Sequence, residues 1–173
     1  NTLPHATGRG VVQKASAILA ASRDAGVMVC YCATVFRPGY PEIGQRNKTF
    51  SLRKASGQTA IPNPLDLIHP GVRPHDDEVV VGKHRVNALY ATGLDLALRA
   101  SDIRDLVILG YATSGVILST VRYAADLDYN LYVVEDCCSD SDVDVHDFLI
   151  GRILPRQADI VQSDDVIQAF GAL

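Results

Sequence analysis

Two hydrophobic periodicities alternate along this chain, and this alternation is what most constrains its fold. Residues 10–25 place apolar side chains at helical spacing, and Gly26 follows where a left-handed C-terminal cap is expected. The unbroken apolar run of residues 27–33 comes next and is typical of a strand buried on both faces of a parallel sheet. The succession recurs downstream, with strands predicted at 78–81, 105–109, 130–135 and 159–161 and helices at 92–100, 115–127, 143–154 and 164–170. The sequence therefore predicts an α/β fold, a three-layer αβα sandwich.

Composition excludes several other classes of protein. The length of 173 residues suits a single domain over residues 1–173, which can bury about 70% of its unfolded surface. A content of 47% hydrophobic and 21% charged residues excludes intrinsic disorder. The net charge is −4 and the 16 Lys and Arg residues are spread along the chain, so we expect neither nucleic acid nor an anionic membrane surface as a partner. No apolar run approaches the roughly 20 residues of a membrane helix.

The four cysteines indicate the redox setting. Cys30 and Cys32 lie in one strand-like run, and Cys137 and Cys138 follow another, without zinc-site spacing. We interpret them as reduced core thiols of a cytoplasmic protein. Residues 1–5 lack a starting Met, a basic segment and an apolar segment, so we expect the natural start of the protein to lie elsewhere.

Residues 36–77 interrupt the alternation, because they are rich in proline and show little periodicity. A structureless segment of this length is too long for a passive connection, so we expect a wall or lid over a site, or a subunit contact. In open α/β sheets, ligands bind beyond the carboxyl ends of the strands. The site is therefore predicted among residues 34–38, 82–87, 110–115 and 136–140.

Two features at these strand ends suggest anion binding. Residues 110–115 form a strand-to-helix turn with two glycines, and the amides of a helix N-terminus favour negative charge. The glycine spacing fits neither a dinucleotide fingerprint nor a phosphate loop, which disfavours a nucleotide-binding domain, and a tight turn alone explains the glycines equally well. Lys83 follows residues 79–82 at the carboxyl end of a predicted strand, so we expect its ammonium at the same edge of the sheet as the turn. An isolated lysine, however, is usually a solvated surface charge.

These two segments carry a family resemblance. Residues 79–95, VVVGKHRVNALYATGLD, and residues 109–120, LGYATSGVILST, closely resemble the isochorismatase-like cysteine hydrolases, and the likeness continues through residues 124–126 and 134–136. That superfamily includes nicotinamidases, N-carbamoylsarcosine amidohydrolase-like enzymes and isochorismatases. The resemblance implies a Rossmann-like parallel sheet of six strands in the order 3-2-1-4-5-6, in homodimers or homotetramers.

The first strand of that sheet has no counterpart in this sequence. It should precede the helix that starts near Gly10, but residues 1–8 are too short and too polar to supply it. A parallel sheet without its central strand would have two unpaired edges. We therefore expect that N-terminal residues outside this sequence, or another segment or chain, fill the gap.

The resemblance also assigns catalytic positions. The family uses an Asp at the end of the first strand, a Lys on the strand after the long loop, and a Cys at the helix start. The Lys matches Lys83, the Cys position is occupied by Val116, and the Asp would fall in the absent strand. An isopropyl group cannot act as a nucleophile, so thioester-type amide hydrolysis is not expected. In the isochorismatase branch an acid protonates a vinyl ether and water attacks, so hydrolysis without the thiol is possible.

Further site residues follow from the same resemblance. It implies a cis peptide between Tyr111 and Ala112 and an oxyanion hole formed by the nearby amides. The expected substrate contacts are Tyr111, Ala112, Thr113, Ser114, Gly115, Asn87, Tyr90 and Arg37. The nicotinamidase branch binds a metal through Asp-x-His where this chain has residues 34–37, TVFR, so neither a metal nor a cofactor is expected.

The histidines outside these segments are expected to be neither metal ligands nor catalytic bases. His69 and His75 lie in the long loop beside Asp76 and Asp77, and we expect them to be solvated because no metal-ligand spacing is present. His146 lies in a predicted helix with apolar neighbours. We expect it to satisfy a local hydrogen bond rather than to act as a base.

Two functions remain open from the sequence. The first is a hydrolase of this superfamily that acts on a small anionic organic molecule, with Lys83 stabilising negative charge and the turn amides holding a carboxylate or an oxyanion. Its chemistry would use water attack or acid-assisted cleavage. The alternative is a non-catalytic binding or assembly module of the same fold, which the presence of Val116 favours.

Overall fold

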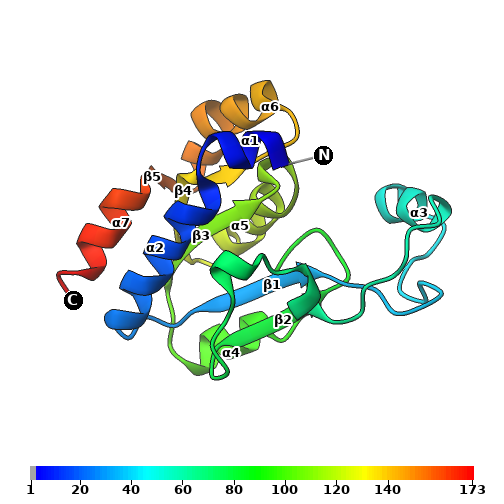
Figure 1. The fold of residues 1–173 in the computed structure, drawn as a ribbon, viewed down its shortest axis with the longest axis horizontal. Coiled ribbons are helices and arrows are strands. Elements are labelled where there is room, and N and C mark those ends of the chain that lie inside the picture. Colours follow the sequence, from blue (N-terminus) through cyan, green and yellow to red (C-terminus); the bar gives the residue numbers. More distant parts are fainter. Residues whose placement is uncertain (1–2) are drawn as a thin grey trace.

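The computed structural model describes residues 3–173, and Asn1 and Thr2, part of the segment expected to be too short for a strand, lie outside the described residues. Strands and helices alternate as predicted, which confirms the α/β class (Figure 1). The strands are β1 (Cys30–Thr34), β2 (Val79–Lys83), β3 (Asp105–Tyr111), β4 (Asn130–Ser139) and β5 (Asp159–Val161). The helices are α1 (Leu3–Gly8), α2 (Val11–Asp24), α3 (Lys48–Ala55), α4 (Leu94–Ala100), α5 (Leu118–Ala125), α6 (Val143–Phe148) and α7 (Ser163–Phe170).

The strands form two parallel sheets instead of the single sheet that was predicted. β1 pairs with β2 from Cys30 opposite Val79 to Thr34 opposite Lys83, and a second sheet has the order β3-β4-β5. Within residues 3–173, the other edges of β1 and β3 pair with no strand, because the chain before α2 forms α1 instead of a strand. The complete strand order that the resemblance implies is therefore not present among the described residues.

The two sheets nevertheless share one hydrophobic core. α4 and α5 contribute Leu94, Leu98 and Val121 to a buried cluster that contacts both sheets. On the opposite face, Ile18 of α2 and Val166 of α7 pack against β4. The two sheets are therefore joined by helices that pack against both of them and not by strand pairing.

The unpaired edges leave apolar side chains incompletely covered. Residues 106–109 of β3 and residues 30–32 of β1 are only half-buried, whereas Val133 and Val134 of the central strand β4 have no exposed surface. Half-buried apolar side chains beside unpaired backbone groups are typical of an edge strand. The half-buried residues of β1 and β3 thus reflect the interruption between the two sheets.

The long segment between β1 and β2 is ordered, which corrects the expectation of a structureless loop. It contains α3 and two short 3-10 turns, at Pro64–Leu67 and Pro70–Val72, and α3 projects away from the sheets (Figure 1). Phe36 is the centre of an aromatic cluster with Tyr40 and Phe50, at ring-centroid distances of 5.5 and 5.1 Å. The segment thus has a small core of its own.

The C-terminal end of α2 agrees with its local sequence signal. Gly26 has φ of 67°, and its amide and that of Val27 donate to the carbonyls of Arg23 and Ser22, as expected for a left-handed cap after α2. Among residues 3–173, every helix is too short or too polar to span a membrane.

Candidate active site

Lys83 is a buried cation without a counter-charge among the described residues. It is the last residue of β2 and is 4% exposed. Its Nζ donates to Thr34 Oγ1 at 2.7 Å and to the carbonyl oxygens of Arg85 and Val86, both at 3.0 Å. These acceptors are all neutral, and no carboxylate of residues 3–173 forms a salt bridge with Lys83. Burial lowers the pKa of Lys83, because a charge is poorly solvated inside the protein.

Close packing of β1 against β2 positions this lysine. Gly82 lies opposite Ala33, and a Cβ at Gly82 would come within 2.6 Å of Val35 Cγ2, so only glycine fits there. The Val35 amide then donates to the Lys83 carbonyl at 3.0 Å, and its carbonyl lies 2.7 Å from His84 Nδ1. The backbone on both sides of Lys83 is thereby held to β1 and its extension.

The glycine-containing turn follows β3 directly. The peptide bond between Tyr111 and Ala112, at which the resemblance implied a cis peptide, is cis in the structure. Residues Thr113–Ile117 then form one π-helical turn that leads into α5. The side chain of Thr113 is completely buried, whereas Ser114 is exposed.

Several amides of this turn are already bonded within the protein. The Ser114 amide donates to Asp140 Oδ2 at 2.6 Å, and the amides of Gly115 and Ile117 both donate to the Ala112 carbonyl, at 3.1 and 3.2 Å. Asp140 is itself 3% exposed. Its carboxylate thus occupies a position at the turn where the sequence analysis expected a ligand anion, and the sequence alone did not single it out.

Asn87, predicted as a substrate contact, forms hydrogen bonds within the protein. Its side-chain Nδ2 donates to the Ser119 carbonyl at 2.8 Å, while Oδ1 accepts the amides of Leu89 and Tyr90 at 2.7 and 2.8 Å. The neighbouring Ala88 amide donates to Thr120 Oγ1 at 3.1 Å. These bonds join the segment after Lys83 to α5, so the side chain of Asn87 is occupied before any substrate binds.

The remaining predicted contacts lie in different surroundings. Val116 is half-buried and packs against the main core, and Tyr111 and Tyr90 are 46% and 52% exposed. Arg37 is exposed and pairs with Glu42 in the long segment. Its guanidinium is therefore engaged with a carboxylate of the long segment.

Comparison with known proteins identifies the family to which this arrangement belongs. The isochorismatase domain family matches residues 2–165, nearly the whole chain. The chain belongs to the isochorismatase family. Among curated relatives of this family member, maleamate amidohydrolase of Pseudomonas putida is 27% identical over 157 residues, which cover 91% of this chain and 73% of that protein. Ureidoacrylate amidohydrolase of Agrobacterium fabrum is 30% identical over 140 residues, which cover 74% of this chain and 61% of that protein.

Solved structures show the same fold. An isochorismatase family protein from Burkholderia thailandensis has a TM-score of 0.78 and 28% identity, covering 93% of this chain and 83% of that one. A cysteine hydrolase from Pseudomonas syringae has a TM-score of 0.84 at 21% identity, covering 94% and 80%, which is evidence for the fold alone.

The thiols of this isochorismatase-family chain are not activated. All four cysteines are free, and burial raises the pKa of Cys32, Cys137 and Cys138 to about 12. Burial also raises the pKa of Cys30. Because the thiolate is the nucleophilic form, these residues are poor nucleophiles at neutral pH.

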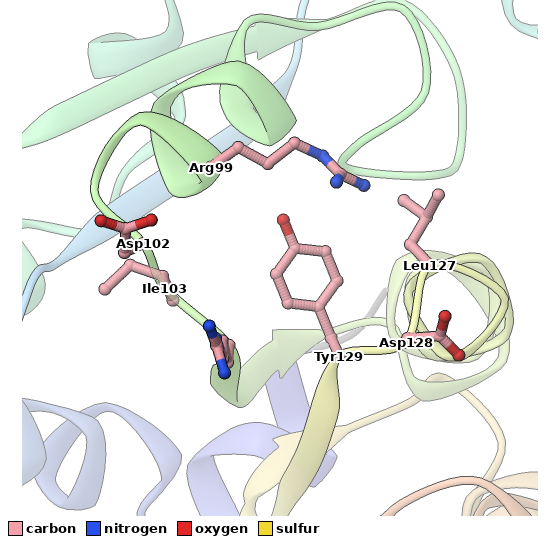
Figure 2. A pocket seen from close by; sticks show the side chains of 7 residues that line it. Arg99, Asp102, Ile103, Leu127, Asp128 and Tyr129 are labelled. Atoms are coloured by element: carbon pink, nitrogen blue, oxygen red, sulfur yellow. The ribbon is translucent and has the colours of Figure 1, made fainter.

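The described residues form no cluster of metal ligands, and a surface hollow lies apart from Lys83. Within residues 3–173, no group of three or more His, Cys, Asp or Glu side chains is placed to hold a metal ion. A hollow of about 350 Å³ lies at the amino ends of β3 and β4 and is lined by Arg99, Asp102, Ile103, Arg104, Leu127, Asp128 and Tyr129. Figure 2 shows how six of these side chains surround it. This hollow lies at the opposite strand ends from Lys83 and the turn, so it is separate from the candidate active site.

Proposed function

We propose that this isochorismatase-family chain is a single hydrolase domain that acts on a small anionic organic molecule without a cysteine nucleophile. The observation that carries the proposal is the Lys83 ammonium, which is buried among neutral acceptors only. A substrate carboxylate, or the oxyanion of a transition state, would supply the missing negative charge in a poorly solvated place where such an interaction is strong.

Water is the nucleophile in this proposal. Val116 has no nucleophilic atom. Cys32 lies in β1 opposite Val81, two residues before Lys83, and its raised pKa keeps its thiol protonated. Cleavage would therefore proceed by direct water attack or by acid assistance. For the second route we expect the acid to be the Asp that the family resemblance places in a strand outside this sequence.

The alternative is a non-catalytic binding or assembly module. Two observations favour it: Val116 replaces the family's thiol, and Lys83 has no acidic partner among the described residues. Such a module would still bind an anion at Lys83 but would not turn it over.

Two further properties belong to the proposal. We expect a homodimer or homotetramer and a cytoplasmic location, the latter because the four cysteines are free. Light scattering coupled to size-exclusion chromatography would measure the mass of the assembly.

The proposed function is tested with a panel of small molecules. We expect hydrolysis of at least one of isochorismate, maleamate and ureidoacrylate, the last two chosen because the relatives are named for them. Maleamide, which replaces the carboxylate of maleamate by a second amide, is the neutral control and should react at least about tenfold more slowly. Ammonia release and product chromatography measure turnover.

The outcomes separate the two candidate functions. Alkylation of the protein with iodoacetamide should leave turnover unchanged, because no thiolate takes part. Binding of the anions in calorimetry without any turnover would identify the binding module instead. Preference for neutral over carboxylate-bearing molecules would contradict both.

A further inference from the structure

His146 is a buried titratable residue that the proposed chemistry does not use. It lies in α6 with no exposed surface, and its Nδ1 is 2.8 Å from Thr113 Oγ1. The expected hydrogen bond is present, but its partner Thr113 is 33 residues away in the sequence. The other ring nitrogen, Nε2, forms no hydrogen bond within the described residues, but lies 3.6 Å from Glu135 Oε1.

Glu135 presents a held negative charge to this histidine. Arg9 forms a salt bridge with its carboxylate, and Gln162 Nε2 donates to Oε2 at 3.2 Å. Burial opposes ionisation of Glu135, but the hydrogen bonds from Arg9 and Gln162 outweigh it and the pKa of Glu135 is lowered. Glu135 is therefore a carboxylate at neutral pH.

These neighbours select one arrangement of protons. A carboxylate beside Nε2 favours the tautomer with its hydrogen on Nε2, and Nδ1 is then an acceptor. The hydroxyl of Thr113 lies 3.2 Å from the Ser139 carbonyl and 2.8 Å from Nδ1, and it donates to the nearer Nδ1 when that nitrogen carries no hydrogen. Glu135, His146 and Thr113 thus form a carboxylate–imidazole–hydroxyl series. Because Thr113 has no exposed surface, its hydroxyl cannot reach a substrate, and the series can only hold Thr113 in place.

We propose that His146 is a positioning residue for the Thr113–Ile117 turn. It holds the hydroxyl of Thr113, the first residue of the turn, while Asp140 holds the amide of the next residue, Ser114. The proposal rests on the proposed function only in that it places this turn in the site. The turn is thereby held by the side chains of Asp140 and His146, both of which follow β4 in the chain.

The charge of His146 should reverse the bond to Thr113. A hydrogen on Nδ1 would make that nitrogen a donor, and Thr113 Oγ1 would then donate to the Ser139 carbonyl, which lies 3.2 Å away. The groups that face the ring are Glu135 of β4, Arg9 before α2, His5 of α1 and Thr113 of the turn. Burial, Arg9 and His5 disfavour a second proton, and Glu135 favours it.

The balance of these groups lowers the pKa of His146 in the folded protein. Its contribution to stability is therefore complete above the unfolded value of about 6.5 and is lost as the pH falls through the lower folded value. The urea midpoint of the natural protein should fall between about pH 7 and about pH 5, and that of His146→Asn should fall less. Equal pH dependence in both would contradict a neutral His146.

Matched substitutions test the positioning role. His146→Asn keeps a polar group near Nδ1 and Thr113→Ser keeps the hydroxyl, whereas His146→Leu and Thr113→Val remove them. We expect His146→Leu and Thr113→Val to lower kcat on the best substrate of the panel about tenfold, with KM changed less than about twofold. For His146→Asn and Thr113→Ser, kcat should stay within about threefold of the natural protein. The same two damaging variants should shift the amide resonances of Ser114 and Gly115 in ¹⁵N spectra.

The spectra separate this proposal from the proposed function. If the protein hydrolyses none of the panel, the positioning role of His146 can still be tested by spectroscopy. Shifted amide resonances of Ser114 and Gly115 in the damaging variants, and an Nδ1 without hydrogen in the ¹⁵N spectrum of the His146 ring, would support it. Folded His146→Leu and Thr113→Val proteins with unshifted turn amides, or a hydrogen on Nδ1 at neutral pH, would overturn it.

Discussion

Replacing Lys83 with Met should lower kcat/KM for the best anionic substrate by about 100-fold, a loss typical of removing one group that stabilises transition-state charge. The methionine side chain fills the space of the lysine stem but cannot carry its charge. Lys83 is 4% exposed and its three acceptors are neutral, so no described carboxylate neutralises its charge. Steady-state kinetics on the hydrolysis panel, and calorimetry for binding, measure the effect.

Stability should change much less than activity. Removing a buried ammonium relieves its desolvation, while Thr34 Oγ1 and two carbonyls lose a donor, so the two effects oppose each other and the free energy of unfolding should move by less than about 2 kcal/mol. Lys54→Met, on the exposed surface of α3, is the matched control and should keep activity within about twofold. Equal activity of Lys83→Met and the natural protein would remove Lys83 from the mechanism.

Replacing Phe36 with Ala should lower the free energy of unfolding by about 3–5 kcal/mol, the usual cost of emptying a buried aromatic site. Phe36 is 1% exposed, contacts Tyr40 and Phe50, and has the Arg53 guanidinium 5.6 Å from its ring centroid. It also follows Val35, whose backbone is bonded to Lys83. Loss of Phe36 should therefore loosen both the long segment and the lysine.

Urea denaturation measures this loss, and limited proteolysis should locate new cleavage within residues 36–77. Leu52→Ala provides the control, because Leu52 is 65% exposed on α3 and should change stability by less than about 0.5 kcal/mol. If the two variants proved equally stable, the aromatic cluster would not be what orders the long segment.

Local periodicity predicted the elements well where one face of each element is apolar. The strand at 130–135 was predicted too short, because β4 continues to Ser139. Its register with β3 shifts after Val133, where Ile108 opposes Val133 but Gly110 opposes Cys138. A bulge of this kind places polar residues such as Asp136 inside a strand, which conceals the last part of the strand from a pattern of alternating apolar side chains.

The missed helix and the unrecognised site residues have a different cause. α3 buries only Phe50, so its apolar periodicity is weak, and the one usable signal was Asn47, which caps it by accepting the Phe50 amide. Lys83 was predicted from its place at a strand end, but its three neutral acceptors depend on how β1 and the following loop fold. The roles of Asp140 and His146 depend on bonds across 26 and 33 residues, which no local pattern encodes.

Lys83 belongs to the two-stranded sheet, and the Thr113–Ile117 turn follows the three-stranded one. The bonds of Asn87 to Ser119 and of Ala88 to Thr120 connect the segments that follow them. Within the described residues, no ladder of strand hydrogen bonds fixes the separation of these two groups. Changes of one or two side chains at Asn87 and Thr120 can therefore shift the segment after Lys83 relative to α5 while both sheets stay intact.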